Sequence, residues 1–254
     1  METGCRRAIL FLLFSPLFGT GFAQTETPVK VDKPLKSYSH WYFGAEYGVP
    51  FLFGDFTSFS ADKTYVGSQF GGFAGYQVNS WIGIEASART GYTRMGAKSY
   101  AGDYLMNADG MTYYTNQDFN TWKYKDVFSK VHFTNIGLQM NLNVNNFFGP
   151  NRGNRRWTVL LGPAVYAQHF STELINKADK SPLSGKKTDK WNIGIGGDVS
   201  LRYKISRAFD VQLRTGIIWV NNNKMDGIST LIKSKDHFMT SAGLSLIWKV
   251  GKKK

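Results

Sequence analysis

The chain has 254 residues, of which 19% are charged and 15% are aromatic, and its formal net charge is +13. Soluble domains average about 25% charged residues, so this low share with many aromatics and glycines is better suited to the wall of a membrane barrel. The only cysteine is Cys5, near the start of the chain, so the remainder can form neither a disulfide nor a thiolate metal site.

The first residues predict a secretory signal peptide over residues 1–23. Arg6 and Arg7 precede a short apolar run, and small residues lead to Ala23, after which we expect cleavage. The apolar run is shorter than the roughly 20 residues that a membrane-spanning helix needs, although a retained N-terminal anchor is the alternative. Residues 24–39 are polar and predict a flexible periplasmic lead-in, and residues 40–254 are assigned to a barrel domain.

From residue 40 onwards, eight segments alternate between apolar and polar residues. Between residues 191 and 203, one parity carries Ile193, Ile195 and Leu201, and the other carries Asp198 and Arg202. Lipid-facing and lumen-facing side chains must alternate in this way along every strand of a transmembrane barrel. The predicted strands cover 40–49, 65–78, 81–95, 131–144, 156–170, 191–203, 209–220 and 236–250. The predicted fold is all-β, an eight-stranded antiparallel transmembrane β-barrel.

Two prolines fall within or beside these segments. Pro50 is expected to end the first strand. Pro163 cannot donate a hydrogen bond to a neighbouring strand, so a β-bulge is expected there.

The connections are alternately long and short. The long ones cover 51–64, 96–130, 171–190 and 221–235. Outer-membrane barrels have long extracellular loops and short periplasmic turns, so both termini are expected in the periplasm. Tryptophans support this orientation, since Trp41, Trp157 and Trp248 fall near the predicted periplasmic ends, and Trp191 and Trp219 near the extracellular ends.

This order of elements resembles the small outer-membrane barrels of the OmpA and OmpX type. The segment from Gly194 to Tyr203, followed by a turn and residues 210–214, is similar to the late strands of the outer membrane protein β-barrel family. The resemblance covers residues 41–250 and implies an integral protein of the outer membrane of a Gram-negative bacterium. Unlike many OmpA proteins, the chain is expected to have no peptidoglycan-binding domain after the barrel, and its last strand is followed by Gly251 and three lysines where the family usually has an aromatic residue.

Charged side chains of the inward parity are expected to pair with one another in the narrow lumen. An eight-stranded barrel is just wide enough for side chains to fill it, and an unpaired buried charge is costly. The predicted lumen charge network consists of Glu46, Glu85, Asp198, Arg89, Arg202 and Arg214. The alternative is a narrow pathway for ions or small solutes.

The loop over residues 96–130 is the candidate surface binding site. Tyrosine and tryptophan are enriched at recognition surfaces, and this loop carries several. They are Tyr100, Tyr104, Tyr113, Tyr114, Trp122 and Tyr124. A surface loop without a ligand is the alternative.

The histidines provide a test of an enzymatic role. His132, His169 and His237 are predicted near the extracellular rim. His169 and Ser171 resemble the His-x-Ser arrangement of outer-membrane lipid A deacylases, but the surrounding residues do not match. We therefore expect no catalytic, cofactor-binding or metal-binding residues, and a lipid-modifying enzyme is the less favoured alternative.

The basic balance and the surface location suggest anionic partners. No nucleic-acid-binding motif accompanies the lysines, which lie mainly in loops and at the C-terminus. The expected partners are lipopolysaccharide and other outer-membrane lipid, the barrel insertion machinery, and an extracellular ligand bound through the long loops. The expected protein is a non-enzymatic monomer with a structural or surface-interaction role.

Overall fold

The computed structural model describes residues 40–60, 63–97, 105–106, 111–113, 122–146, 155–183, 188–221, 225–230 and 237–250. The predicted signal peptide and lead-in lie outside these residues. Within them, none of the helices has the length and apolar character needed to cross a membrane.

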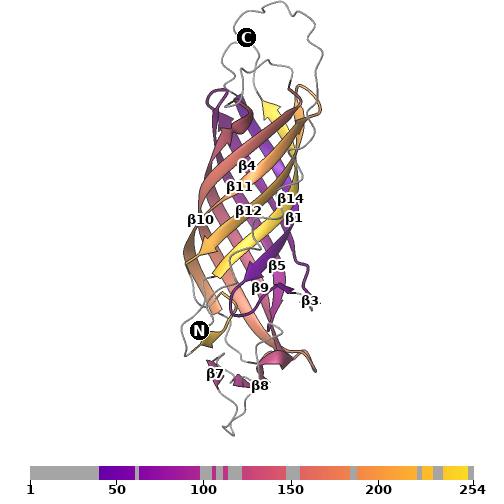
Figure 1. Ribbon diagram of the computed structural model, residues 1–254, viewed down its shortest axis with the longest axis vertical. Helices are drawn as coiled ribbons and strands as arrows, with labels where there is room; N and C mark the ends of the chain where they lie inside the picture. Colours follow the sequence, from indigo (N-terminus) through magenta and orange to yellow (C-terminus); the bar gives the residue numbers. More distant parts are fainter. Residues whose placement is uncertain are drawn as a thin grey trace, which may run out of the picture. The chain divides into compact units, whose positions relative to one another are not determined.

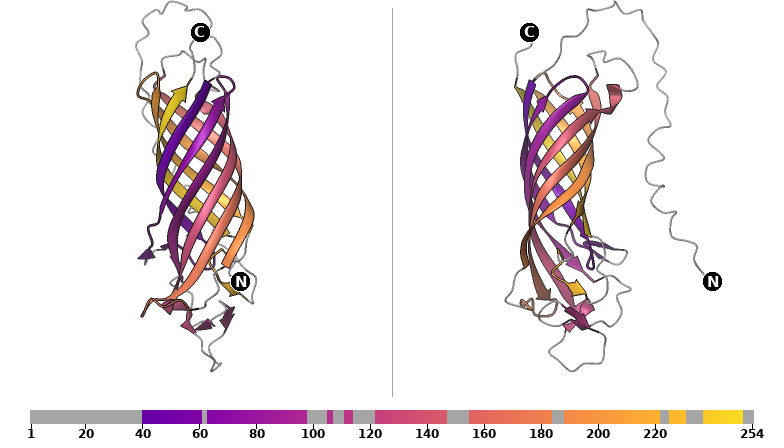
Figure 2. Two further views of the ribbon diagram at one scale, coloured as in Figure 1. Left: turned by 180° about the vertical axis from the view of Figure 1, so that it is seen from behind. Right: turned by 90° about the vertical axis from the view of Figure 1, so that its left-hand side faces the viewer.

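Eight long strands form a closed antiparallel barrel (Figures 1 and 2). They are β1 (His40–Phe53), β4 (Ser68–Gln77), β5 (Ile82–Gly96), β9 (Val127–Asn143), β10 (Trp157–Asn176), β11 (Thr188–Lys204), β12 (Phe209–Val220) and β14 (His237–Val250). Each strand pairs with the next along the chain, and β1 closes the barrel by pairing with both β14 and β4, with Trp41 opposite Val250. Closure satisfies the backbone groups that an open sheet would leave unpaired in lipid. The predicted fold class is confirmed.

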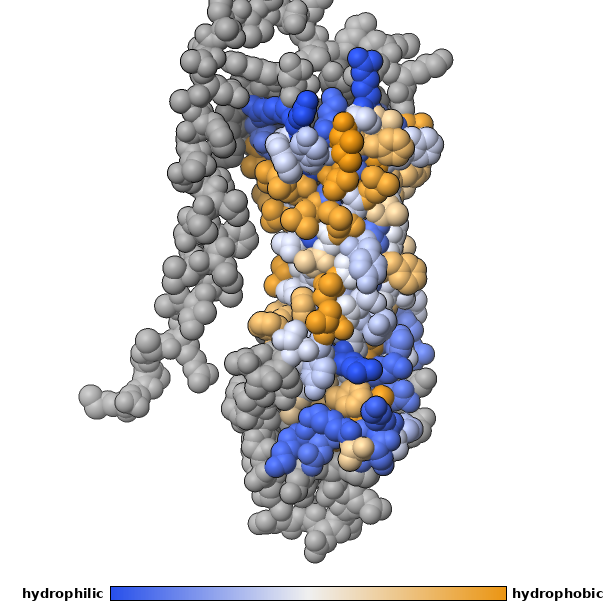
Figure 3. Space-filling model, turned by 90° about the vertical axis from the view of Figure 1, so that its right-hand side faces the viewer, coloured by the Kyte–Doolittle hydropathy of each residue, from blue (hydrophilic) through white to orange (hydrophobic). Residues whose placement is uncertain are grey.

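The outward-facing side chains of these strands form an apolar wall. Ile193 and Ile195 on β11 expose 70% and 58% of their surface, and Leu138 on β9 exposes 59%. In Figure 3, hydrophobic residues gather on the wall between hydrophilic residues towards either end. Such a wall is stable against hydrocarbon, because lipid contact keeps the apolar side chains out of water. The barrel is therefore a transmembrane one.

Exposed tryptophans lie at both ends of this wall. Trp41, Trp157 and Trp248 lie at the end that carries the barrel's first and last strand residues, and Trp191 and Trp219 lie towards the opposite end. The long connections 54–67, 97–126, 177–187 and 221–236 all leave the barrel at that opposite end. By the rule of long extracellular loops, it is the extracellular end.

Beyond the apolar wall on the extracellular side, β9 and β10 continue with their hydrophobic pattern inverted. On β9, Lys130 and His132 face outwards, whereas Val131 and Phe133 are buried inside the barrel. On β10, Leu174 is likewise buried inside. A transmembrane strand needs about 9–11 residues, so these strands extend beyond the membrane. We call the part formed by residues 127–134 of β9, 169–176 of β10 and their neighbours the extracellular tier.

Short elements occupy the connections. β6 (Leu105–Met106), β7 (Met111–Tyr113), β8 (Trp122–Lys123) and β13 (Ser229–Thr230) form a small four-stranded sheet, and β2 (Phe59–Ser60) pairs with β3 (Lys63–Thr64). Two 3₁₀ turns, η1 (Tyr124–Asp126) and η2 (Val144–Asn146), flank β9. The loop predicted over 96–130 therefore contains strand pairing of its own.

Both proline predictions are wrong. β1 continues through Pro50 to Phe53, because beyond Gly48 it pairs with β14 alone and the missing N–H faces no second strand. At Pro163 the register of β10 is continuous on both sides, so there is no bulge. The pairing with β9 is interrupted only at Gly162 and Pro163, where the proline cannot donate.

Candidate functional site

Arg214 on β12 is the centre of an ion-pair network in the membrane-spanning part of the lumen. Its Nη2 lies 2.7 Å from Glu85 Oε1, its Nε lies 3.6 Å from Asp198 Oδ2, and its Nη1 lies 3.6 Å from Glu46 Oε2. Arg89 Nε lies 3.2 Å from Glu46 Oε1. The structure thus brings together five of the six charged residues expected there, and all five are buried.

Arg202 is the residue that stays outside this network. Its Nε donates to Gln212 Oε1 at 2.9 Å, and its guanidinium carbon lies 5.0 Å from the centre of the Tyr42 ring. No carboxylate in the described part of the chain forms an ion pair with it. Tyr42, which the sequence reasoning had not singled out, takes that place between Arg202 and Glu85.

Uncharged side chains complete the hydrogen bonds of the lumen carboxylates. The Tyr42 hydroxyl donates to Glu85 Oε2 at 3.1 Å, and Asn141 Nδ2 donates to the same oxygen at 3.0 Å. Gln139 Nε2 donates to Asp198 Oδ1 at 3.0 Å. Inward parity could have identified these residues, since each lies on the inward-facing side of its strand. Nearer the periplasmic end, Lys249 Nζ forms a further ion pair with Asp210 Oδ1 at 2.6 Å.

The lumen of the extracellular tier is closed by apolar side chains. They come from the strand ends, from the connection after β1 and from the connection between β12 and β14. The cluster consists of Leu52, Phe56, Met95, Ala97, Val127, Val131, Phe133, Phe170, Leu174, Val220, Met225, Ile228 and Met239. Met225 and Ile228 are fully buried, so residues 225–228 of the last long connection lie in the mouth of the barrel. The barrel interior is therefore filled at two levels, by ion pairs in the membrane and by this apolar plug above them.

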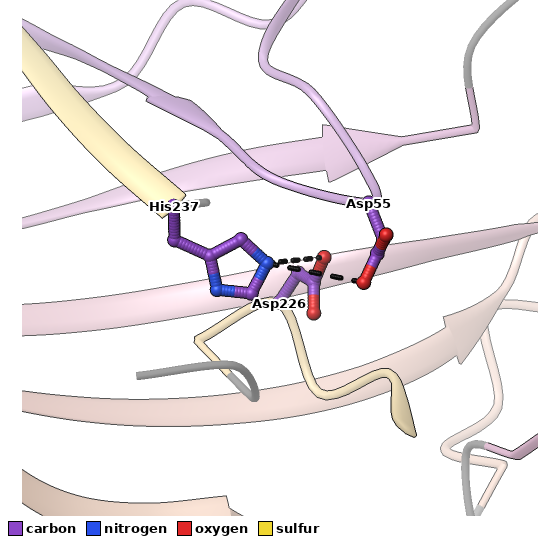
Figure 4. Close-up of side chains that lie close together, drawn as sticks. All are labelled: Asp55, Asp226 and His237. Atoms are coloured by element: carbon purple, nitrogen blue, oxygen red, sulfur yellow. Dashed lines mark ion pairs between the residues drawn. The ribbon is translucent and has the colours of Figure 1, made fainter. Parts of the chain in front are cut away.

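Three polar side chains meet at the edge of the plug (Figure 4). His237 Nε2 lies 3.6 Å from Asp226 Oδ2 and 3.9 Å from Asp55 Oδ2. The Asp226 carboxylate accepts hydrogen bonds from the backbone N–H groups of Phe56 at 3.0 Å and Ile228 at 3.1 Å. Burial raises the pKa of Asp226, and the neighbouring Asp55 adds to this shift while His237 opposes it. We call Asp55, Asp226 and His237 the rim triad.

The turn that carries Asp226 is fixed to the inner wall of the tier. Thr172 Oγ1 donates to the Met225 carbonyl at 2.6 Å, and Ser129 Oγ donates to the carbonyl of Asp226. Gly227 has a φ of 81°, a conformation that favours glycine. Sequence reasoning missed this site because Asp55 and Asp226 lie in segments that it assigned to unpatterned loops.

The other rim histidines face outwards. His169 contacts Asp189 through Nε2 and lies with its ring centre 4.9 Å from that of Trp191. Ser171 and Glu173 share the outward parity of His169 on β10, and His132 is exposed on β9. The outward positions of His132 and His169 are those expected of histidines at the level of the lipid headgroups.

The aromatic loop is described only in part. Tyr113, Trp122 and Tyr124 lie in β7, β8 and η1, whereas Tyr100, Tyr104 and Tyr114 lie outside the described residues. Their role in binding stays a prediction.

No protein-family model and no curated protein matches the sequence. Among solved structures, the chain is similar to a major outer membrane protein from Thermus thermophilus, at 11% identity and a TM-score of 0.47, covering 83% of this chain and 99% of that one. It is also similar to Ail of Yersinia pestis, at 10% identity and a TM-score of 0.43 over 84% and 99% of the two chains. Neisserial surface protein A shows 12% identity and a TM-score of 0.43 over 83% and 97%. The apolar wall, the polar lumen and the alternation of long and short connections are themselves those of an outer-membrane barrel.

Proposed function

We propose that this protein is a non-enzymatic outer-membrane barrel that acts at the cell surface, where its extracellular tier and loops contact anionic saccharide such as that of lipopolysaccharide. The observation that carries the proposal is the division of the barrel into a filled interior and a tier that stands clear of the membrane. A filled interior favours a role on the outer surface over a role in transport through the lumen.

The filling of the lumen supports a closed barrel. The ion pairs of Arg214 cross the membrane-spanning part of the interior, and fully buried side chains such as Phe56 and Met225 occupy the level above. A solute would have to displace both layers, each of which is held by chain segments that are far apart in sequence.

Basic side chains on the outside of the tier support an anionic partner. Arg94 and Lys130 lie opposite each other on β5 and β9, and both face outwards. Lys180 is exposed in the connection that follows β10. Cations at the headgroup level attract phosphate and carboxylate groups, and the attraction weakens as salt increases.

The test measures binding of purified lipopolysaccharide to the detergent-folded protein at low and high salt. Replacing Arg94 and Lys130 together by alanine is expected to weaken binding about fivefold at low salt, since each exposed pair is worth roughly 0.5 kcal/mol. The matched control replaces Arg156 and Arg207, which are exposed at the periplasmic end, and is expected to bind like the wild type. Equal losses in the two double variants would contradict the proposal.

Two further measurements separate the rival functions. In planar bilayers the wild-type protein is expected to give no steady conductance, so a reproducible open level would favour a channel. Incubation with lipopolysaccharide should leave the acyl chains of lipid A intact, so release of fatty acid would favour an enzyme.

A further inference from the structure

We propose that the rim triad of Asp55, Asp226 and His237 is a binding site for a divalent transition-metal ion, of which Zn²⁺ is the best match. The site lies at the extracellular end of the barrel and is separate from the basic outer surface that the proposed function uses.

The distances within the triad fit an ion between the three side chains. One ligand atom from each residue lies within 4.8 Å of the other two, and the imidazole nitrogen is 3.6 and 3.9 Å from the two carboxylate oxygens. Both distances exceed the usual range for a direct N–H···O hydrogen bond, about 2.7–3.2 Å. Donors about 2.0–2.2 Å from a tetrahedral zinc ion lie roughly 3.3–3.6 Å apart. The two nitrogen–oxygen distances would therefore need to shorten by only a few tenths of an ångström to reach this spacing.

The ligands are held in place before any ion binds. The side chains of Asp226 and His237 are fully buried, and only 9% of the Asp55 side chain is exposed. The two backbone N–H groups that donate to Asp226 fix the direction of its carboxylate, and a carboxylate with two such bonds retains further lone pairs for a metal. Carboxylates that bind a metal ion are usually held by hydrogen bonds of this kind from groups behind them.

Gly54 leaves the space that the imidazole occupies. A Cβ atom at this position would lie 2.4 Å from His237 Cδ2 and 2.6 Å from Nε2, so a larger residue would push the ring away from the two carboxylates. The triad is therefore a packed arrangement of a glycine, an imidazole and two carboxylates from three segments.

The imidazole nitrogen and the two carboxylates indicate which kind of ion would bind. Two carboxylates beside one imidazole favour a divalent cation, because such an ion balances the negative charge that burial would otherwise penalise. Imidazole suits Zn²⁺, Ni²⁺ and Cu²⁺, whereas Ca²⁺ and Mg²⁺ prefer sites made wholly of oxygen. Three protein ligands leave a fourth position for water.

Metal binding would join three segments that are distant in sequence. Asp55 follows the end of β1, Asp226 lies in the connection between β12 and β14, and His237 begins β14. The ion would hold the turn at 225–228 in the mouth of the barrel and so secure the apolar plug.

The test uses the full mature chain without a histidine tag, folded in detergent and freed of metal with a chelator. Zinc binding is measured by competition with a chromophoric chelator, and metal content by elemental analysis. We expect one zinc per chain, and Asp55→Asn and His237→Gln are each expected to weaken binding at least tenfold. His169→Gln is the matched control, because His169 also lies beside an aspartate but on the outer face, and it should bind like the wild type.

A second measurement, the unfolding temperature with and without zinc, separates a loss of zinc binding from a loss of folding. Zinc is expected to raise the unfolding temperature of the wild-type and His169→Gln proteins but not that of Asp55→Asn, whose residue lies nearest the surface. The proposal is overturned if the wild type takes up no stoichiometric zinc, or if Asp55→Asn and His237→Gln both bind it with wild-type affinity. The first result would leave the triad as a histidine paired with two carboxylates, without a metal ion.

Discussion

Arg214 balances more charge than any other described side chain of the lumen, since it lies within ion-pair distance of Glu46, Glu85 and Asp198. Replacing it with methionine keeps much of its volume but leaves three carboxylates facing Arg89 alone. We expect the free energy of unfolding to fall by about 3–5 kcal/mol, the usual cost of breaking a buried ion pair. Urea unfolding of the detergent-folded protein measures this loss.

Two control variants test whether the loss of stability is specific to Arg214. Arg202→Met should cost less than Arg214→Met, because Arg202 bonds to an amide and an aromatic ring. Lys190→Ala, on an exposed side chain, should change the urea midpoint little. A wild-type midpoint for Arg214→Met would show that the carboxylates of the lumen do not depend on this arginine.

Gly75 gives a second prediction at the scale of single residues. A Cβ atom there would lie 2.1 Å from Cζ of Tyr42, so Gly75→Ala must displace the ring that bonds to Glu85 and Asn141. The expected loss is about 1–3 kcal/mol, as for other overpacked interiors. Gly72→Ala on the same strand is the control, because its Cβ would meet only a carbonyl oxygen at an ordinary 3.5 Å. Thermal unfolding should separate the two variants, and equal melting temperatures would contradict the packing described for Tyr42.

At the scale of strands, the extracellular tier explains why some boundaries were predicted and others were not. β12 runs over 209–220 as predicted, because apolar residues occupy most of its outward positions from Phe209 to Trp219. On β9 the apolar residues change parity between Phe133 and Ile136, and the segment 127–130 beyond this change was assigned to a loop although it is paired. The inversion marks where the outer surroundings change from lipid to water, and a pattern rule that assumes one environment does not follow a strand far beyond it.

Introduced cysteines can locate this change on β9, since the only cysteine of the sequence lies in the predicted signal peptide. A water-soluble maleimide should label His132→Cys in intact cells, because that side chain is exposed above the wall. Leu138→Cys should react only with a lipid-soluble reagent, because its side chain is exposed on the apolar wall. Val131→Cys, buried in the plug, should resist both until the protein unfolds. Equal protection of His132→Cys and Leu138→Cys from the water-soluble reagent would mean that β9 does not leave the membrane here.

At the scale of the whole molecule, closure of the barrel depends on the eight long strands and not on the small sheet of the loops. Replacing residues 100–121 by a short Gly/Ser link removes β6 and β7 but leaves the pairing of β5 with β9. The truncated protein should still insert and retain its heat-resistant mobility in gels, because the entropy of loop closure changes slowly with length. Failure to insert would show that the loop contributes to the folding of the wall. Loss of ligand binding by a normally folded truncation would support the binding role predicted for the aromatic loop.

The candidate sites could be predicted only in part. Parity alone identifies Glu46 and Glu85 as lumen residues, because the side-chain period of a strand is two. It does not show that Arg214 lies among three carboxylates while Arg202 lies against Tyr42, because these contacts depend on how far neighbouring strands are displaced along the barrel axis. The rim triad depends on closure itself, which brings the connection after β1 beside the start of β14.

The length of β10 sets how far from the bilayer a partner would meet the loops. With a rise of about 3.3 Å per residue and a strand tilt of roughly 35–45°, the stretch from His169 to Asn176 lifts them about 20 Å above the apolar wall. Lipid headgroups and the inner sugars attached to them occupy much of that height. Under the proposed function, a ligand would therefore reach the extracellular end of the protein without disturbing the packing of the surrounding lipid, while the flank of the tier would contact those sugars.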